Sequence, residues 1–373
     1  MRIGFDAKRA FLNQAGLGNY SRNTLISLKK HFPENDYVLF TPEIRKGIFP
    51  EQSDFDVYSP DSPASKIFKS LWRSFSLSGM LKKQEIDLFH GLTHELPSGI
   101  HKTGVKSVVT IHDLIFLRYP QYYKSIDRKI YLQKIKYACD VTNRIVAISN
   151  QTRDDIIHFL DIDPSKIDVV FQGISPRFYS NEEADFSVLK RKYNLPDRYI
   201  LSVGTIELRK NQMNILKGML SSNINIPLVL VGKPTQYAIK LSEFASKNGM
   251  ERNVIILNEV SDEELPSLYQ NAQMLVYISE FEGFGLPIIE AMASGCPVLT
   301  SNKSCMPETG ADAAKYCDPL NIEEVGELMS NILNNEKLRN QLIEKGKKRA
   351  QEFTYEKTSA ALFEIYNKVF GNG

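Results

Sequence analysis

The chain has 373 residues, of which 42% are apolar and 24% are charged. One hydrophobic core rarely serves more than roughly 300 residues, so this length predicts two domains, and the composition excludes a disordered chain. No run reaches the roughly 20 apolar residues that a membrane-spanning helix needs. The four cysteines form no C-x-x-C pair and the N-terminus does not resemble a signal peptide, so we expect a cytoplasmic protein.

The charge is uneven along the chain. Residues 1–180 hold 25 Lys and Arg against 19 Asp and Glu, a net charge of +6, while residues 181–373 hold 21 against 25, a net charge of −4, which together give +2. A basic half fits an acidic partner, such as the anionic inner face of a plasma membrane, and uneven solvated charge explains the counts equally well. We expect no nucleic-acid partner.

Short apolar runs alternate with helical stretches along the whole chain. The first half contains RIGFD, YVLF, IDLFH, SVVTIHD, RIVAIS and IDVVFQG, and the second contains YILSVG, PLVLVG, NVIIL, QMLVYIS and CPVLTS. This alternation is typical of β-α-β units with buried parallel strands, so we expect an α/β protein with two doubly wound domains. Gly, Ser, Pro and acidic residues interrupt the pattern at 172–186, and we place the domains at 1–180 and 181–354.

The loop after the first predicted strand contains Gly16 and Gly18, in QAGLGNYSRNTL, before a predicted helix. Glycines there let a phosphate approach the backbone, and an ordinary turn explains them as well. Ser21 stands where the dinucleotide-binding pattern has its third glycine, so a nicotinamide cofactor is not favoured.

The segment from Ala64 to Gln84 carries five Lys or Arg and no acidic residue. Its apolar residues, including Trp72, recur at helical spacings, and basic residues beside such a stripe suit the surface of an anionic membrane. A core-facing helix with solvated lysines explains the pattern as well.

Polar residues follow two predicted strands at their carboxyl ends. His112 and Asp113 follow SVVTI, where a side chain can contact a sugar hydroxyl. Arg209 and Lys210 follow YILSVG, where two cations can neutralise a diphosphate leaving group in place of a metal. An exposed basic turn is the alternative for this second pair.

The sequence gives no convincing metal site. His90, His94 and His101 lie close together in the chain, but no second set of histidines and carboxylates has metal-ligand spacing. The strings DFD at 54–56 and DID at 161–163 do not follow buried strands and fit solvated turns. We therefore expect neither a metal nor a cofactor.

The stretch SEFEGFGLPIIEAMASGCPVLT is the most informative one. Proline suits the start of a helix and glycine the residue after its end, so we expect a helix over 287–294 followed by Gly295. Gly285 lets the backbone approach a ligand, and the helix start favours an anion. Glu290 can then accept hydrogen bonds from a ribose, and Glu282 from a sugar beyond the phosphates. Such a ligand is a nucleotide sugar.

These motifs together resemble a retaining glycosyltransferase of family four over nearly the whole chain. EGFGLPIIEAM is similar to the two-glutamate signature of that family, VGTIELRKN to its diphosphate loop and AGLGNYSR to its N-terminal glycine loop. TIHDL, AISNQTRDDI and VVFQGI are similar to further landmarks. The resemblance implies the GT-B fold, in which two Rossmann-like domains face each other across a cleft, and a last helix, about 355–370, that crosses back onto the first domain.

The resemblance also implies a role for individual residues. Glu282 and the amides of Phe284 and Gly285 would contact the donor sugar, Glu290 the ribose, and Arg209 and Lys210 the diphosphate. The remaining donor contacts would be Gly16, Gly18, Gly232, Lys233, Val260 in LNEVSDEEL, and Leu286. Many relatives have an extra arginine where this chain has Thr205, so the diphosphate depends more on Arg209 and Lys210.

Within the family, HDLIFLRYPQYY and GTIELRKNQ are most similar to mannosyltransferases of bacterial surface-polysaccharide assembly, such as lipopolysaccharide. This favours GDP-mannose as donor and a saccharide or lipid-linked saccharide as acceptor. A UDP-sugar donor, a nucleotide-sugar epimerase of similar fold and a silent nucleotide-sugar-binding subunit remain open. A glycosidase would also use two carboxylates, but it needs no cationic phosphate clamp.

Retention without an obvious nucleophile fits a same-face displacement, in which the leaving diphosphate accepts the proton of the acceptor hydroxyl. Catalysis is then electrostatic and positional. We expect Lys210 and Arg209 to stabilise the leaving group, Glu282 to orient the sugar, and His112 to hold a donor hydroxyl.

Overall fold

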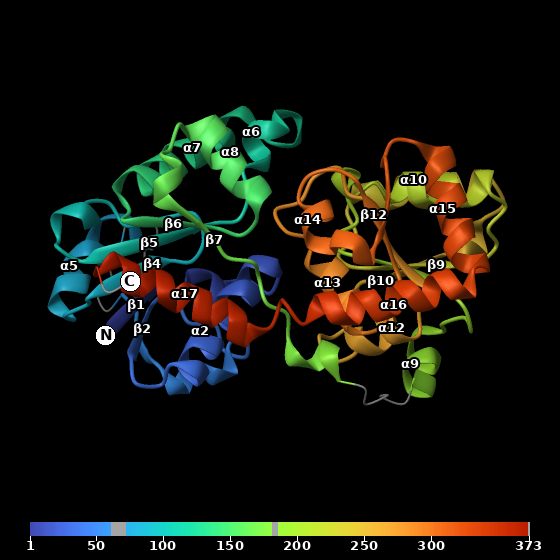
Figure 1. Ribbon diagram of the computed structural model, residues 1–373. Helices are drawn as coiled ribbons and strands as arrows, with labels where there is room; N and C mark the ends of the chain where they lie inside the picture. Colours follow the sequence, from blue (N-terminus) through green and yellow to red (C-terminus); the bar gives the residue numbers. More distant parts are fainter. Residues whose placement is uncertain (61–71, 181–185, 372–373) are drawn as a thin grey trace. The chain divides into compact units, whose positions relative to one another are not determined.

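The computed structural model describes residues 1–60, 72–180 and 186–371, and it divides into two compact units (Figure 1). Unit 1 consists of Met1–Gly173 and Tyr355–Gly373, and unit 2 consists of Ile174–Thr354. Each unit has its own parallel sheet with helices packed against it, so the predicted α/β class with two doubly wound domains is confirmed.

Unit 1 has a seven-stranded parallel sheet in the order β3-β2-β1-β4-β5-β6-β7. The strands are β1 (Arg2–Asp6), β2 (Asp36–Phe40), β3 (Asp56–Tyr58), β4 (Leu88–Gly91), β5 (Lys106–Ile111), β6 (Arg144–Ala147) and β7 (Ile167–Val169). The helices are α1 (Lys8–Leu12), α2 (Gly16–His31), α5 (Leu77–Lys83), α6 (Ile115–Arg118), α7 (Ser125–Val141), α8 (Asn150–Leu160) and α17 (Tyr355–Val369). The strand order reverses between β1 and β4, which makes their carboxyl ends a ligand-binding position.

Both faces of this sheet are buried, which explains why its strands are almost continuously apolar. Val108 packs in one cluster with residues of α2 and α17. The next residue, Val109, packs in another cluster with residues of α5, α7 and α8. Successive side chains of a strand point to opposite faces, so a strand covered on both sides needs an apolar residue at each position.

The last helix, α17, belongs to unit 1 although unit 2 separates it from the rest of that unit in the sequence. It packs along α2 and buries Leu362 and Ile365. The hydroxyl of Tyr366 lies 2.7 Å from Nδ1 of the buried His90 at the end of β4, so a polar contact inside the core also fixes the helix.

The basic segment 64–84 lies partly outside the described residues. Within the described part, Trp72 is buried in the core of unit 1, and Arg73 is buried beside Asp6 at 3.1 Å. These two side chains are therefore not available to contact a membrane, because Trp72 packs in the core and Arg73 forms an ion pair. Of the helices in the described ranges, none is long and apolar enough to cross a bilayer.

Unit 2 has a six-stranded parallel sheet in the order β10-β9-β8-β11-β12-β13. The strands are β8 (Ile200–Val203), β9 (Leu228–Val231), β10 (Val254–Leu257), β11 (Met274–Tyr277), β12 (Val298–Ser301) and β13 (Lys315–Cys317). The helices are α9 (Phe186–Tyr193), α10 (Gln212–Ser221), α11 (Gln236–Lys247), α12 (Leu265–Gln270), α13 (Leu286–Ala293), α14 (Met306–Gly310), α15 (Ile322–Asn334) and α16 (Glu336–Ala350). Here the order reverses between β8 and β11, so the loops after these two strands flank the ligand-binding position of the unit.

Candidate functional site

The loops after β8 and β11 meet at the carboxyl edge of the unit 2 sheet. The first forms a short turn, η7 (Leu208–Lys210), and ends at Asn211, whose φ of 60° is left-handed. The backbone carbonyl of Arg209 accepts a hydrogen bond from the amide of Glu280 at 3.0 Å. This bond ties the two loops together, so the cations of one loop are held next to the carboxylate of the other.

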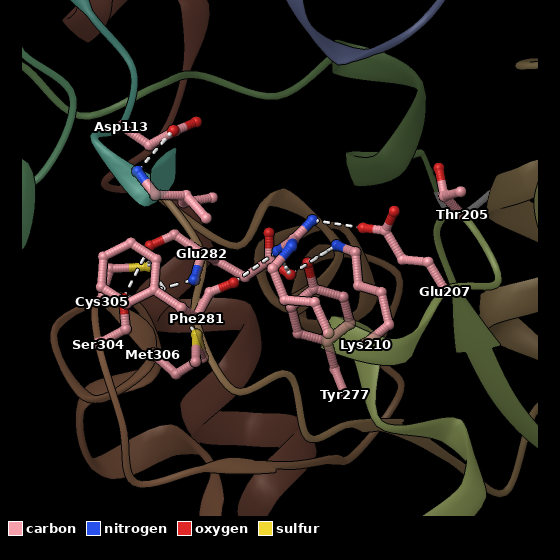
Figure 2. Close-up of polar contacts among 12 residues, drawn as sticks. Asp113, Thr205, Glu207, Lys210, Tyr277, Phe281, Glu282, Ser304, Cys305 and Met306 are labelled. Atoms are coloured by element: carbon pink, nitrogen blue, oxygen red, sulfur yellow. Dashed lines mark hydrogen bonds and ion pairs between the residues drawn. The ribbon is translucent and has the colours of Figure 1, made fainter. Parts of the chain in front are cut away.

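Arg209, Lys210 and Glu282 form one ion-pair cluster, in which Figure 2 labels Lys210 and Glu282. Glu282 Oε1 lies 2.6 Å from Lys210 Nζ and 2.8 Å from Arg209 Nη1. Lys210 also donates to the hydroxyl of Tyr277 at 2.7 Å, and Arg209 Nη2 lies 2.6 Å from Glu207 Oε1. The structure thus brings together three of the four residues that the sequence predicts to act in catalysis.

The protonation states follow from burial and from these neighbours. Burial alone would raise the pKa of the Glu282 carboxyl, but the charges of Lys210 and Arg209 outweigh burial and hold the pKa at about 2. Burial lowers the pKa of Lys210, with a further contribution from Arg209 and against the attraction of Glu282. Glu282 faces two cations, which strongly favours its ionised form, whereas Lys210 pays the cost of burial and of repulsion by Arg209.

The backbone of Glu282 is held from the loop after β12. Its carbonyl accepts hydrogen bonds from Ser304 Oγ at 2.8 Å and from Cys305 Sγ at 3.2 Å (Figure 2). Ser304 has a φ of 54°, in the left-handed region that non-glycine residues rarely adopt. Three adjacent strands therefore position this one carboxylate.

Glu290 lies on α13, one turn beyond the glycine-rich loop. The predicted helix over 287–294 is observed as Leu286–Ala293, and Gly295, with a φ of 76°, follows its end as expected. Glu290 Oε2 accepts a hydrogen bond from the hydroxyl of Tyr269 on α12 at 2.9 Å. Burial raises the pKa of Glu290 to about 7, against the effect of this hydrogen bond. The two glutamates of the motif therefore differ, because only Glu282 is paired with cations.

The backbone conformation of Gly285 and the packing of Phe284 explain why these residues occur in the motif. Gly285 has a φ of 91° and directly precedes α13, where most other residues would be strained. The Phe284 ring packs against Phe353, 5.7 Å between ring centroids, and its carbonyl accepts a hydrogen bond from Thr309. Leu286 is half-buried at the first position of the helix.

The other predicted donor contacts of unit 2 follow β8, β9 and β10. Gly232 follows β9 with a φ of 149°, and a Cβ there would lie 2.1 Å from the carbonyl oxygen of Gly204, so packing alone requires this glycine. Lys233 beside it is exposed, and Thr205 is half-buried with its carbonyl accepting from Gln212 at 3.2 Å. Val260 lies in the loop after β10 and is half-buried.

His112 is the predicted catalytic residue that belongs to unit 1. Its Nε2 donates to the carbonyl of Leu92 at 2.9 Å, and Gln172 Nε2 approaches its Nδ1 at 3.4 Å. Burial, with a smaller contribution from His94, lowers its pKa to about 3. The ring is therefore neutral at physiological pH, and a sugar hydroxyl at Nδ1 would have to replace the long Gln172 contact.

Gly16 and Gly18 lie in the first turn of α2, and their surroundings differ. A Cβ at Gly18 would lie 1.7 Å from the carbonyl oxygen of Asn13, so close packing of the loop requires this glycine. A Cβ at Gly16 would meet no atom within 4 Å. Packing therefore does not explain why residue 16 is a glycine. Close approach of a ligand to this backbone is the explanation that can be tested.

Sequence reasoning missed Glu207, Tyr277 and Tyr269 as members of the site. Glu207 and Tyr277 stand in stretches already singled out, ELRKN and QMLVYIS, but nothing local marks them as partners of Arg209 and Lys210. Tyr269 lies at the end of α12, outside any motif. Across the described ranges, no group of three His, Cys, Asp or Glu side chains is arranged to hold a metal ion.

Two family descriptions match the chain, one in each half. Residues 21–178 match "Glycosyltransferase Family 4" and residues 185–349 match "Glycosyl transferases group 1". O-antigen chain mannosyltransferase B of Escherichia coli is 28% identical over 285 residues, which cover 75% of this chain and 74% of the relative. O-antigen chain mannosyltransferase RfbU of Salmonella typhimurium is 28% identical over 294 residues, which cover 75% and 78%.

Solved structures share the fold over the whole chain. A glycosyltransferase from Rickettsia africae superposes with a TM-score of 0.77 at 17% identity and covers 100% of this chain and 99% of that one. Anabaena Alr3699/HepE in complex with UDP and glucose superposes with a TM-score of 0.76 at 16% identity and covers 99% and 100%. The predicted GT-B class is therefore confirmed.

The family matches cover both halves of the chain and agree with the motifs of the sequence and with the two Rossmann-like sheets. The resemblance identified from the motifs is thus confirmed. The chain is a glycosyltransferase that belongs to family 4, with a family 4 domain in its N-terminal half and a group 1 domain in its C-terminal half.

Proposed function

We propose that this glycosyltransferase transfers mannose from GDP-mannose, with retention of anomeric configuration, to a saccharide or lipid-linked saccharide acceptor in surface-polysaccharide assembly. The observation that carries the chemistry is the cluster of Lys210, Arg209 and Glu282 at the strand-order reversal of unit 2. The two O-antigen mannosyltransferases that are 28% identical over 75% of the chain support the choice of sugar and of pathway class.

The chemistry follows from the charges of these side chains. The bond from the anomeric carbon to the diphosphate breaks, and the leaving diphosphate gains negative charge that Lys210 and Arg209 stabilise without a metal. The acceptor hydroxyl forms the new bond on the same face of the sugar, and its proton passes to the leaving diphosphate. Glu282 stays ionised because its pKa is about 2, so it accepts hydrogen bonds from donor hydroxyls and does not donate a proton.

Glu290 and the glycine loop supply donor binding in this proposal. Glu290 accepts hydrogen bonds from the ribose hydroxyls, and the backbone at Gly285 approaches the donor. The basic character of residues 1–180, with a net charge of +6, supports a peripheral contact with an anionic membrane at the inner face of the plasma membrane, where a lipid-linked acceptor would lie.

A thermal-shift series tests the donor. The full chain is heated with GDP, UDP and ADP and with their sugar derivatives, and a ligand of the folded state raises the unfolding midpoint by mass action. We expect the largest shifts with GDP and GDP-mannose. A larger shift with UDP and UDP-glucose would reject GDP-mannose in favour of a UDP-sugar donor.

Turnover is measured as nucleotide release from the preferred donor, with and without a glycolipid extract as acceptor. We expect release to depend on acceptor and to continue in EDTA. Release without acceptor would favour an epimerase or hydrolase, and no release would favour a silent binding subunit. Proton NMR of the glycoside product reads the anomeric configuration, and an inverted product would reject retention.

A further inference from the structure

The carboxyl ends of β1 and β4 in unit 1 carry a second group of charged side chains. These strands are neighbours, with Phe5 opposite His90, and the strand order reverses between them. Asp6 is the last residue of β1, Lys8 and Arg9 are the first two residues of α1, and the loop after β4 contains His94 and Glu95. Reversal points of this kind bind ligands in open α/β sheets.

The two carboxylates of this group already have cationic partners. The buried Arg73 lies 3.1 Å from Asp6 Oδ2 and also pairs with Glu95. Lys134 on α7 lies 3.3 Å from the same Glu95. These ion pairs connect the end of β1 to the loop after β4, and each of the two carboxylates already has a cationic partner.

Lys8 and Arg9 are the cations that remain. Both side chains are half-buried, and neither makes a hydrogen bond or an ion pair with another residue in the described part of the chain. Burial, followed by the charges of Arg73 and Arg9, lowers the pKa of Lys8 to about 8, so its ammonium is still mostly charged at pH 7. Asp6 attracts Lys8 but forms no ion pair with it, so in the described part of the chain these two half-buried cations have no carboxylate in contact, which favours an anionic ligand.

His94 provides a second, independent indication of a ligand at the same place. Its Nδ1 is buried and has no hydrogen-bond partner among the described residues, although buried polar atoms are nearly always satisfied. Burial, with a contribution from Arg9, lowers the pKa of His94 to about 4, so the ring is neutral. Its centroid lies 5.3 Å from that of His112. A neutral imidazole near Arg9 suits a hydroxyl or a phosphate oxygen.

We propose that the ends of β1 and β4 bind a phosphate group of the acceptor through Lys8 and Arg9, with His94 as a neutral hydrogen-bonding neighbour. Four cations, Lys8, Arg9, Arg73 and Lys134, stand against the two carboxylates of Asp6 and Glu95, and the surplus of two charges matches a phosphate monoester dianion. Arginine and lysine are the usual protein ligands of phosphate. The assignment to the acceptor rests on the proposed function, and it makes the acceptor a phosphorylated saccharide.

Titration calorimetry of the full chain with inorganic phosphate tests this inference. We expect Lys8→Gln and Arg9→Gln each to weaken binding by about tenfold or more, as loss of a hydrogen bond to a charged group does. Lys102→Gln removes the same charge from an exposed position of unit 1 and should bind phosphate like the parent. Unfolding midpoints of all variants verify that they are folded.

Further arms separate the sources of binding. If Lys210→Gln weakens phosphate binding while the Lys8 and Arg9 variants do not, the phosphate binds in unit 2 and the inference is overturned. Equal binding by all variants overturns it as well. Glucuronate is titrated in parallel. If glucuronate binds more tightly than phosphate, the ligand of this site is a carboxylate and the proposal of a phosphate is rejected. GDP is titrated separately. If GDP does not bind, the proposed donor is rejected, and the phosphate titration still tests the site at Lys8 and Arg9.

Discussion

Glu282 Oε1 lies 2.6 Å from Lys210 Nζ, although the two residues follow different strands of the unit 2 sheet. The carboxylate proposed to orient the donor sugar and the cation proposed to meet the leaving group therefore share one electrostatic environment. A change of charge at either residue alters the other, and mutational effects at the two should not be additive.

Lys210→Ala should lower kcat by roughly 10²- to 10³-fold and change the KM for donor much less, because the negative charge that Lys210 meets grows in the transition state. Steady-state kinetics with varied donor measure both constants. Lys240→Ala, at an exposed lysine of α11, is the matched control and should behave like the parent. A near-normal kcat in Lys210→Ala would remove this lysine from catalysis.

Glu282→Gln should lower the free energy of unfolding at pH 7 by about 3 kcal/mol, because Lys210 loses its carboxylate and Arg209 keeps only its ion pair with Glu207. The folded pKa of Glu282, about 2, lies below its usual 4.5, so its contribution is complete above pH 4.5 and disappears as the pH falls toward 2. Urea unfolding of parent and variant at several pH values should give curves that converge in acid. Glu327→Gln, at an exposed position of α15, should follow the parent throughout, and a constant gap for Glu282→Gln would contradict the assigned pKa.

Nucleotide affinity should depend on pH through Glu290. Its pKa of about 7 means that the ionised form, the better acceptor for two ribose hydroxyls, increases between pH 6 and pH 8. Affinity of the parent should rise by up to about tenfold over this range, as a single titration allows. Calorimetry on Glu290→Gln provides the reference, because the nucleotide phosphates titrate equally in both proteins. Parallel pH profiles would show that Glu290 does not contact the ribose.

Gly16 and Gly18, in the first turn of α2, should respond differently to alanine. Gly18→Ala places a Cβ 1.7 Å from the Asn13 carbonyl and should lower the unfolding midpoint. Gly16→Ala meets no atom within 4 Å and should leave the midpoint unchanged while lowering turnover, if the donor phosphates pass close to this backbone. Normal turnover in a stable Gly16→Ala protein would exclude that approach.

The full chain should sediment with phosphatidylglycerol vesicles and should be released by salt, because the attraction is electrostatic and screened within about 8 Å at physiological ionic strength. Replacing Lys82 and Lys83, exposed at the end of α5, by glutamate should reduce sedimentation. The control makes the same charge change at Lys240 and Lys247 on α11. Equal loss in both variants would indicate a general charge effect and no membrane contact at α5.

Much of the fold could be predicted because its determinants are local. The apolar runs mark the strands, and the proline and glycine around 287–294 delimit a helix that is observed at Leu286–Ala293. The grouping of Arg209, Lys210 and Glu282 could be anticipated from their places after strands, since carboxyl ends of parallel strands share one edge.

What could not be predicted depends on which strands are neighbours. Tyr277 becomes a partner of Lys210 because β8 lies beside β11, and strand order leaves no local signal. Arg73 belongs to the same basic segment as the exposed Lys82 and Lys83, yet it is buried because Asp6, far away in the chain, supplies a carboxylate. Long-range pairing decides these cases.

The place of α17 has a consequence for how the protein is made. A ribosome completes residues 174–354 before it adds the helix that supplies Leu362, Ile365 and Tyr366 to the core of unit 1. Domains usually fold in order of synthesis, N-terminal first, but here the later domain is the first to have its whole sequence. The nascent N-terminal sheet must wait with the α17 side of its core uncovered, and a stop codon shortly before Tyr355 would leave that surface permanently exposed to chaperones and proteases.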